Sequence, residues 1–310
     1  MSKTVPAFID LQVNGHGGID ILSITSTDEL RSVGRSLWSQ GVQAYLPTLI
    51  TGPLDRSVEV MKLIEQVRRS PREDEAEIIG IHLEGPFLSP EKPGTHPLNF
   101  LRLPTRELIG AYLAAGTVTM VTLAPELPGA LEAIEFLTQM GVIVSLGHSN
   151  ATAAQAHAGF DAGARCVTHI WNAMNKDRQA GVAAAALERE EIYIMMIIDG
   201  QHLDDDLVKY TIDKAPQRFI VTNDAIVAAG LGDGSFPFGT FEINVKDGRA
   251  TRADGTLSGG VGSLKDSLAR MLALGVDFDS ALASITSRPG ELIGRPELGQ
   301  LSLGIRTTVV

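Results

Sequence analysis

Eight short segments that are apolar at nearly every position recur through the first three quarters of the chain. They are rich in β-branched residues and span residues 5–12, 43–50, 78–84, 118–124, 142–148, 166–172, 192–199 and 218–224. Segments of this length without a polar face are typical of strands that are buried on both sides of a parallel sheet. The pattern therefore predicts eight buried parallel strands.

Segments with a helical pattern fill most of the gaps between these strands. Residues 27–40 begin with Thr-Asp-Glu, a helix cap followed by acidic residues in the first turn. Further helices are predicted at residues 54–69, 127–140, 151–162 and 204–215. The alternation predicts an α/β fold, a (β/α)8 barrel of the TIM type. A doubly wound open sheet is the alternative, but no glycine-rich phosphate-binding motif follows the first strand, so the nucleotide-binding form of that fold loses its main support.

The last quarter of the chain differs from this alternation. Residues 240–257, with a turn at Lys246-Asp-Gly, are interpreted as a β-hairpin insertion. Helices at 261–274 and 280–287 are expected to close the barrel, and residues 301–310 to form a short strand or an exposed tail. The charged stretch 72–77 is interpreted as a solvated loop. We therefore expect residues 1–310 to form a single barrel domain.

Composition and charge narrow the function classes. The 310 residues include 26 Lys and Arg against 37 Asp and Glu, which gives a formal net charge of −11. An acidic chain repels a polyphosphate backbone, so nucleic acid is not an expected partner. The single cysteine, Cys166, excludes an internal disulfide. The first residues lack an apolar signal segment, and the longest apolar runs are too short to cross a membrane, so we expect a cytoplasmic protein without a membrane partner.

Polar side chains gather where the predicted strands end. Eight of them follow or end strands one, three, five, six, seven and eight: Gln12, Asn14, Glu84, His148, His169, Asp199, His202 and Asp224. The C-terminal ends of barrel strands meet at one rim, where barrel enzymes carry their functional groups. This common placement, rather than any single residue, predicts a site at that rim.

The residue types at this rim indicate metal-assisted hydrolysis. Glu84, His148 and His169 supply one carboxylate oxygen and two imidazole nitrogens, a ligand set typical of catalytic metal sites with an open position for water. Asp224 is a candidate to accept the proton of that water and to return it to a leaving amine. His202 is a candidate donor to the developing oxyanion. Together these groups fit the hydrolysis of an amide.

Each of these residues also has a structural alternative. Glu84 can cap a turn, and Asp224 can be a buried ion-pair partner. His82 lies between apolar neighbours, so a structural role and a role in supporting the site are both open. His16 lies in a glycine-rich loop where contact with solvent alone is the alternative, and His157 is interpreted as a structural residue of a helix.

Several motifs in one order resemble the N-acetylglucosamine-6-phosphate deacetylase family of the amidohydrolase superfamily. The similarity runs from about Phe8 to Gly294. It is carried by the segments that begin Asp10-Leu-Gln-Val-Asn-Gly-His, His82-Leu-Glu-Gly-Pro-Phe, Gly94-Thr-His, Gly147-His-Ser-Asn, Thr168-His-Ile-Trp-Asn-Ala-Met, Asp199-Gly-Gln-His, Asn223-Asp-Ala and Gly255-Thr-Leu-Ser-Gly. The resemblance implies a barrel enzyme that releases acetate from N-acetylglucosamine 6-phosphate in amino-sugar catabolism.

The resemblance also implies roles for individual residues. Glu84, His148 and His169 match the metal ligands of the family, and Asp224 matches its catalytic acid and base. His202 matches a histidine that engages the acetyl carbonyl or the hydroxyls of the substrate. The positions that match those holding the sugar phosphate are Thr95, His96, Asn172 and Ala173. Arg178 is the nearest candidate for the phosphate-binding arginine that the family has shortly after Asn-Ala-Met, and Leu257 matches a loop residue that lines the acetyl end.

The first strand bears on the number of metal ions. Many amidohydrolases carry His-x-His there and hold two metals, often with a lysine on strand four. This chain has Gln12 and Asn14 instead, and residues 118–124 contain no lysine. We therefore expect one divalent ion. Zinc is favoured by the donor set, and iron, cobalt and manganese are compatible with it.

Two departures from the family affect the expectations. The chain begins and ends close to the barrel, so the small β-sandwich of the family is expected to be absent or vestigial. Whether the phosphate pocket and a homodimer interface form without this sandwich is therefore undecided by the sequence. Asn223 stands where the family has Thr or Ser, with little expected effect on the chemistry. The alternatives are a deacetylase of N-acetylgalactosamine 6-phosphate or of an unphosphorylated N-acetyl sugar, and a non-catalytic sugar-phosphate sensor.

Overall fold

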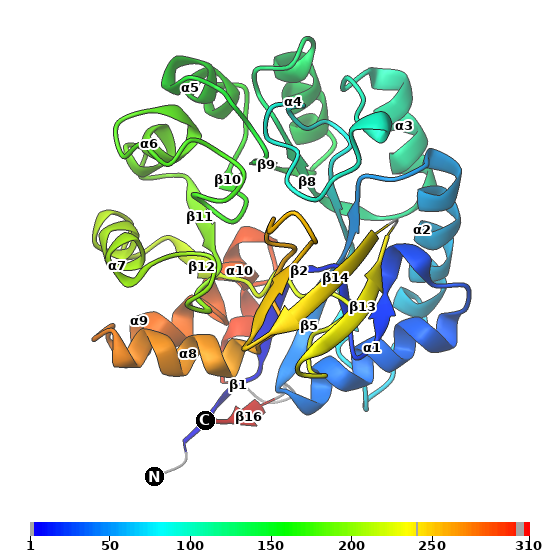
Figure 1. Ribbon diagram of the computed structural model, residues 1–310, viewed down its shortest axis with the longest axis vertical. Helices are drawn as coiled ribbons and strands as arrows, with labels where there is room; N and C mark the ends of the chain where they lie inside the picture. Colours follow the sequence, from blue (N-terminus) through cyan, green and yellow to red (C-terminus); the bar gives the residue numbers. More distant parts are fainter. Residues whose placement is uncertain (1–2, 240, 302–306) are drawn as a thin grey trace.

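Eight parallel strands form the central sheet of this computed structural model, which describes residues 3–239, 241–301 and 307–310. Each strand pairs with the next along the chain, in the order β2 (Phe8–Val13), β5 (Val42–Ile50), β7 (Ile81–Glu84), β8 (Val118–Leu123), β9 (Ile143–Leu146), β10 (Cys166–Val167), β11 (Tyr193–Met196) and β12 (Phe219–Val221). A parallel bridge between Val13 and Ala225 brings the last strand back to the first. The predicted (β/α)8 barrel is confirmed (Figure 1).

Helices surround the barrel (Figure 1). They are α1 (Thr27–Ser39), α2 (Leu54–Arg68), α3 (Arg106–Ala115), α4 (Ala130–Gln139), α5 (Ala153–Asp161), α6 (Gly181–Leu187), α7 (Asp205–Lys214), α8 (Leu264–Ala273), α9 (Phe278–Ala283) and α10 (Ser287–Leu292). Ser26 and Glu29 form a reciprocal capping box that begins α1. The single-turn 3-10 helices are η1 (Ile21–Ser23), η2 (Leu98–Phe100) and η3 (Pro296–Gly299).

The sequence pattern missed three helices, α3, α6 and α10, and misplaced α9. Helix α6 is rich in alanine and nearly all of it is buried, so it has no polar face that would mark a helical period. Helix α3 was also not predicted. The predicted helix at 280–287 is wrong in its bounds: the Asp277 side chain caps an earlier start, and the chain leaves the helical conformation at Thr286, between α9 and α10.

Several other expectations need correction or refinement. The first predicted strand is two strands, because β1 (Thr4–Pro6) leaves the barrel and pairs antiparallel with β16 (Thr307–Val309). The strand predicted at 301–310 is therefore found in part, and residues 302–306 lie outside the described residues. The stretch 72–77 is not a solvated loop throughout, since Glu75 is buried and forms an ion pair with Arg31. Within the described chain, no helix is long and apolar enough to span a bilayer.

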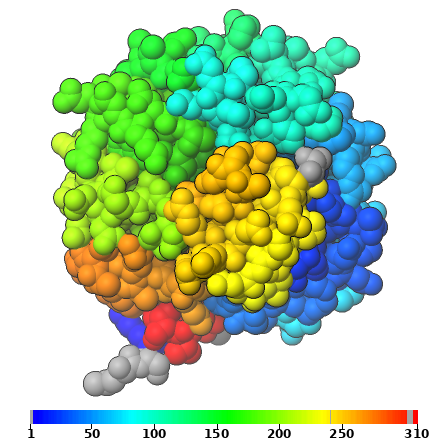
Figure 2. Space-filling view, viewed as in Figure 1, coloured from blue at the N-terminus to red at the C-terminus, as the bar shows by residue number. Residues whose placement is uncertain are grey.

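The predicted hairpin insertion forms a three-stranded antiparallel sheet. It consists of β13 (Gly234–Phe238), β14 (Phe241–Lys246) and β15 (Arg249–Thr251), so it begins before the predicted start, Thr240, which lies outside the described residues. The turn at Asp247 and Gly248 has positive φ at both residues, as a tight hairpin requires. In Figures 1 and 2 this sheet and the loop after it lie over the centre of one face of the barrel.

The interior of the barrel changes from apolar to polar along its axis. Small and aliphatic side chains fill one end: Ile9, Leu11, Ala44, Leu46, Met120, Cys166, Met195, Ile220 and, from η3, Leu298. A second apolar layer packs between the strands and the outer helices. Polar side chains fill the C-terminal end of the strands, beneath the hairpin sheet. The apolar core therefore occupies one end of the barrel, and the C-terminal end of the strands is available for a functional site.

Two short pairings complete the described strands. In the glycine-rich loop after β2, β3 (Gly15–His16) pairs antiparallel with β4 (Ile19–Asp20). The two-residue strand β6 (Glu77–Ile78) pairs with β5 before the chain continues into β7.

Candidate metal and catalytic site

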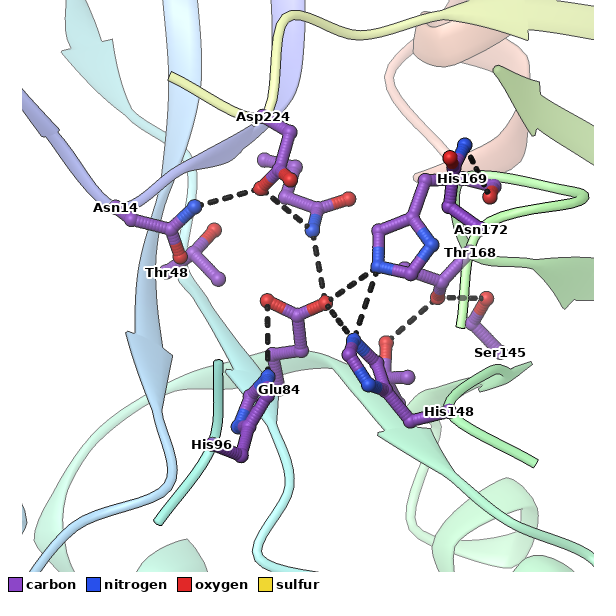
Figure 3. A network of polar contacts seen from close by, with 12 residues as sticks. Asn14, Thr48, Glu84, His96, Ser145, His148, Thr168, His169, Asn172 and Asp224 are labelled. Atoms are coloured by element: carbon purple, nitrogen blue, oxygen red, sulfur yellow. Dashed lines mark hydrogen bonds and ion pairs between the residues drawn. The ribbon is translucent and has the colours of Figure 1, made fainter. Parts of the chain in front are cut away.

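Four side chains meet at the C-terminal end of the barrel, three of them buried and the fourth, Asp224, half-buried (Figure 3). Glu84 is the last residue of β7. His148 and His169 each come two residues after a strand, β9 and β10, and Asp224 comes three residues after β12. Parallel strands therefore bring together residues that are up to 140 positions apart in the sequence.

Three of these side chains present ligand atoms to one point. Glu84 Oε1 lies 2.9 Å from His169 Nε2 and 3.2 Å from His148 Nε2, and the two imidazole nitrogens are 3.1 Å apart. Tetrahedral ligands about 2.0–2.1 Å from a zinc ion are about 3.3 Å from one another. The three atoms thus have the mutual spacing that a single small divalent ion requires.

Hydrogen bonding prepares His148 for this arrangement. Its Nδ1–H donates to the carbonyl oxygen of Lys92 at 3.0 Å, which leaves the Nε2 lone pair for the cluster. The loop that carries Lys92 can approach because residue 94 is glycine, where a Cβ atom would lie 3.0 Å from the imidazole. Burial opposes the charging of His169, but Glu84 outweighs it and raises the pKa of His169. The cluster is therefore a place of negative potential, which favours a cation.

The backbone is strained where three of these residues leave their strands. The φ angles are +48° at His148, +28° at His169 and +51° at Asp224. Positive φ in a non-glycine residue costs on the order of 1–2 kcal/mol, and such residues cluster at functional sites. This strain is also why the strand predicted at 166–172 ends at Val167.

Two amides of the first strand hold the carboxylates in place. Gln12 Nε2 donates to Glu84 Oε1 at 3.0 Å and to Asp224 Oδ1 at 2.9 Å, and Asn14 Nδ2 donates to Asp224 Oδ1 at 2.7 Å. Both amides use their NH2 groups as donors to carboxylates. The groups that the first-strand amides turn toward the carboxylates are therefore NH2 donors, which cannot bind a cation there.

The carboxyl groups of Glu84 and Asp224 have opposite shifts in proton affinity. Burial, together with the negative charge of Glu84, raises the pKa of Asp224 well above its usual range. Burial also acts against ionisation of Glu84, but the neighbouring imidazoles of His148 and His169 outweigh it and hold the pKa of Glu84 well below its usual range. A proton shared by this pair resides on Asp224. This difference between the two pKa values assigns the role of metal ligand to Glu84 and that of acid and base to Asp224.

His96 lies against the cluster rather than at the outer wall of the cavity. The backbone N–H of Thr51 donates to its Nδ1 at 3.2 Å, so its own proton is on Nε2. That Nε2 atom is 3.9 Å from Glu84 Oε2, and the ring is 4.5 Å from the His148 ring. Burial lowers the pKa of His96 to about 3, which keeps the imidazole neutral. His96 is thus a neutral hydrogen-bond donor beside the metal-ligand cluster.

His202 is oriented by Asp199, a residue to which the sequence alone assigned no role. Asp199 Oδ2 accepts a hydrogen bond from His202 Nδ1 at 2.7 Å, and Asp199 Oδ1 accepts the backbone N–H groups of Gln201 and His202. Burial works against ionisation of Asp199, but the bond from His202 prevails and lowers the pKa of Asp199 to about 2. The other ring nitrogen of His202 is left for the cavity that this residue lines.

A cavity of about 380 Å³ connects these groups. Ten predicted site residues line it: Asn14, Glu84, Thr95, His96, His148, His169, Asn172, Ala173, His202 and Asp224; Leu257, from the loop after the hairpin sheet, is an eleventh. Gln12 is fully buried behind the carboxylates. Arg178 does not line the cavity, because its guanidinium stacks on the ring of Tyr210 at 4.4 Å.

The cavity wall also contains residues that the sequence did not single out. Lys176 comes from the loop after β10, and Phe238 and Arg249 come from the hairpin sheet. Lys176 is only two positions from Arg178, so spacing alone could not choose between them. The hairpin residues had no sequence signal, because only its placement over the barrel brings them to the cavity.

The remaining histidines have structural partners. His82 donates from Nδ1 to the Leu11 carbonyl and accepts at Nε2 from Thr122, and burial lowers its pKa to about 4. It therefore ties β7 to its neighbours below Glu84. His16 contacts Ser36 and Gln40, and His157 contacts Glu188 at the surface. None of these three lines the cavity.

Comparison with known proteins gives a consistent result. The family model described as "Amidohydrolase family" matches residues 4–306, a range that includes every site residue above. N-acetylgalactosamine-6-phosphate deacetylase of Escherichia coli O157:H7 is 33% identical over 98% of this chain and 82% of its own length. N-acetylglucosamine-6-phosphate deacetylase of Bos taurus is 35% identical over 93% of this chain and 74% of its own.

A solved structure extends the likeness to three dimensions. The crystal structure of N-acetylglucosamine-6-phosphate deacetylase from Pasteurella multocida superposes with a TM-score of 0.93 at 30% identity. The match covers 99% of this chain and 82% of that one.

Proposed function

Because the chain belongs to the amidohydrolase family of metal-dependent hydrolases, and within it to the N-acetylglucosamine-6-phosphate deacetylases, we propose that it hydrolyses the acetamide of N-acetylglucosamine 6-phosphate. The products are acetate and glucosamine 6-phosphate, a step of amino-sugar catabolism. The observation that carries the proposal is the meeting of Glu84, His148 and His169 at one point beside Asp224.

The proposed cofactor is one divalent metal ion held by Glu84, His148 and His169. Its donor set favours zinc and is compatible with iron, cobalt or manganese. When bound, such an ion polarises a carbonyl and lowers the pKa of water. Gln12 and Asn14 support a single ion, because their NH2 groups face the carboxylates where a second ion would need lone pairs.

Asp224 is proposed to carry the proton between water and the leaving amine. Gln12 and Asn14 both donate to its Oδ1, while its Oδ2 has no hydrogen-bond partner among the described residues. The free oxygen is therefore the one that can take a proton. Burial and the charge of Glu84 favour the protonated form, so the proton taken from water is retained until the amine leaves.

His96 is proposed to stabilise the oxygen of the acetyl carbonyl as negative charge develops on it. Its proton is fixed on Nε2 by the bond from Thr51, and it stays neutral because it is buried. A donor that is already oriented needs no rearrangement during the reaction. His202, held by Asp199, is proposed to contact the carbonyl or the hydroxyls of the sugar from the other part of the cavity.

N-acetylgalactosamine 6-phosphate is the second candidate substrate. The Escherichia coli relative that carries this name matches this chain as well as the N-acetylglucosamine enzymes do. The two sugars differ only in the orientation of one ring hydroxyl. An unphosphorylated N-acetyl sugar is the third candidate substrate. A cytoplasmic location and a homodimer stay predictions.

Acetate release from a panel of acetamido sugars tests the proposal. The protein is stripped of metal and reloaded separately with Zn²⁺, Fe²⁺, Co²⁺ or Mn²⁺, and then given N-acetylglucosamine 6-phosphate, N-acetylgalactosamine 6-phosphate and both sugars without phosphate. We expect the highest kcat/KM with N-acetylglucosamine 6-phosphate and no turnover without metal. A higher value for the galactose epimer would establish the second candidate. No acetate from any pair of metal and sugar would refute both.

A further inference from the structure

Two cationic side chains line the outer part of the cavity. Lys176 lies in the loop between β10 and α6, and Arg249 is the first residue of β15 in the hairpin sheet above the barrel mouth (Figures 1 and 2). Both side chains are exposed, whereas Glu84, at the inner end of the cavity, is buried and Asp224 is half-buried. We propose that Lys176 and Arg249 bind the phosphate group of the substrate and set the preference for phosphorylated sugars, an inference that rests on the proposed deacetylase function.

These two cations are not used in ion pairs. Among the residues that the structure describes, the side chains of Lys176 and Arg249 have no hydrogen bond, ion pair or aromatic ring as a partner. Other arginines near the barrel mouth do: Arg252 lies 3.8 Å from Asp254, and Arg270 is paired with Asp205. In a chain with a net charge of −11, two unpaired cations on one cavity wall are available for an anionic ligand.

The charges in the cavity are arranged to orient the substrate. Within the described residues, Glu84 and Asp224 are the acidic groups that line it and Lys176 and Arg249 are the Lys and Arg side chains. A phosphate dianion is therefore attracted to the exposed part of the cavity, where the two cations lie. With the phosphate held there, the acetamide can extend toward Asp224 at the other end of the cavity.

This arrangement replaces Arg178 as the phosphate-binding residue. The Arg178 guanidinium stacks on Tyr210 and does not line the cavity, whereas Lys176, on the same loop, does. Arg249 comes from the hairpin sheet, so that sheet contributes to substrate specificity as well as covering the cavity.

Charge-removing variants test the inference. Lys176→Met and Arg249→Met, singly and together, are compared with the parent protein on N-acetylglucosamine 6-phosphate and on N-acetylglucosamine. Lys246→Met is the matched control, since Lys246 is the cross-strand partner of Arg249 but does not line the cavity. Arg178→Met tests the competing assignment, and Arg249→Lys tests whether charge alone is sufficient. Circular dichroism and Tm establish that each variant is folded.

We expect each single variant to lose about tenfold in kcat/KM on the phosphorylated sugar, mainly through KM, since a hydrogen bond to a charged group is involved but lies in a partly solvated place. The double variant should lose more than either. Activity on the plain sugar should change by less than about twofold. Arg249→Lys should recover part of the loss, and the variants should depend less on salt than the parent does.

The outcomes separate this inference from the proposed function. If the parent protein deacetylates the phosphorylated sugar but the Lys176 and Arg249 variants behave like Lys246→Met, the inference is wrong and the function stands. The same holds if Arg178→Met alone causes the loss, or if losses are equal with both sugars. If the parent releases no acetate from any sugar, the proposed function itself fails.

Discussion

Replacing Asp224 with asparagine removes the proposed proton carrier with the smallest change in shape. An asparagine can place its carbonyl oxygen where Asp224 Oδ1 now accepts from Gln12 and Asn14, at 2.9 and 2.7 Å. Its NH2 group then replaces Oδ2, and an amide nitrogen cannot accept the proton of water. General acid–base catalysis contributes about 10²–10⁴-fold, or about 3–5 kcal/mol of barrier, so kcat should fall by that factor.

The assay combines turnover with metal analysis. Acetate release by Asp224→Asn is measured under saturating N-acetylglucosamine 6-phosphate, and metal content is measured by elemental analysis. Metal should stay bound, because Glu84, His148 and His169 are unchanged. The isosteric control is Asp206→Asn, which alters an exposed aspartate in helix α7. Turnover within a few fold of the parent would refute the role assigned to Asp224, and a loss of metal would place this residue among the ligands instead.

Three further predictions follow from the buried charges. Glu84→Ala should empty the metal site and abolish turnover; full metal occupancy by elemental analysis would contradict the assigned ligand set. Burial raises the pKa of Asp10 from 3.8 to about 6, so the folded protein binds this proton more tightly than the unfolded chain, and stability is lost as the pH rises from about 4 to 6. At pH 8 the free energy of unfolding of Asp10→Asn, measured with urea, should therefore exceed that of the parent by up to about 3 kcal/mol. At pH 4 the difference between the two proteins should be smaller. An equal difference at both pH values would disprove the prediction. Asp199→Asn leaves His202 Nδ1 without its carboxylate, so kcat/KM should fall about tenfold with metal content unchanged; an unaltered kcat/KM would show that this pair is not needed.

The sequence by itself determined the architecture and the chemical content of the site. Runs that are apolar on both faces are typical of a parallel sheet covered by helices, so eight of them, alternating with helical segments, predicted the barrel. The order of strands then required Glu84, His148, His169 and Asp224 to reach one rim. Their residue types indicated a metal and a proton carrier, because few other functions use a carboxylate and two imidazoles with a separate acid.

Only the tertiary structure decided how these residues act on one another. The positive φ angles of His148 and His169, the position of the proton on His96 and the Gln12 amide that links Glu84 to Asp224 all depend on backbone turns and on neighbours that are distant in the sequence. Local patterns carry no such information.

The same limit applies to the proposed phosphate contacts. Arg178 and Lys176 are nearly adjacent, and the choice between them depends on Tyr210, a residue of helix α7 that takes the guanidinium of Arg178. Arg249 reaches the cavity because a hairpin inserted after the last strand lies over the barrel mouth. Sequence periodicity specifies which face of an element is buried, whereas the packing of separate elements specifies which side chains share a cavity.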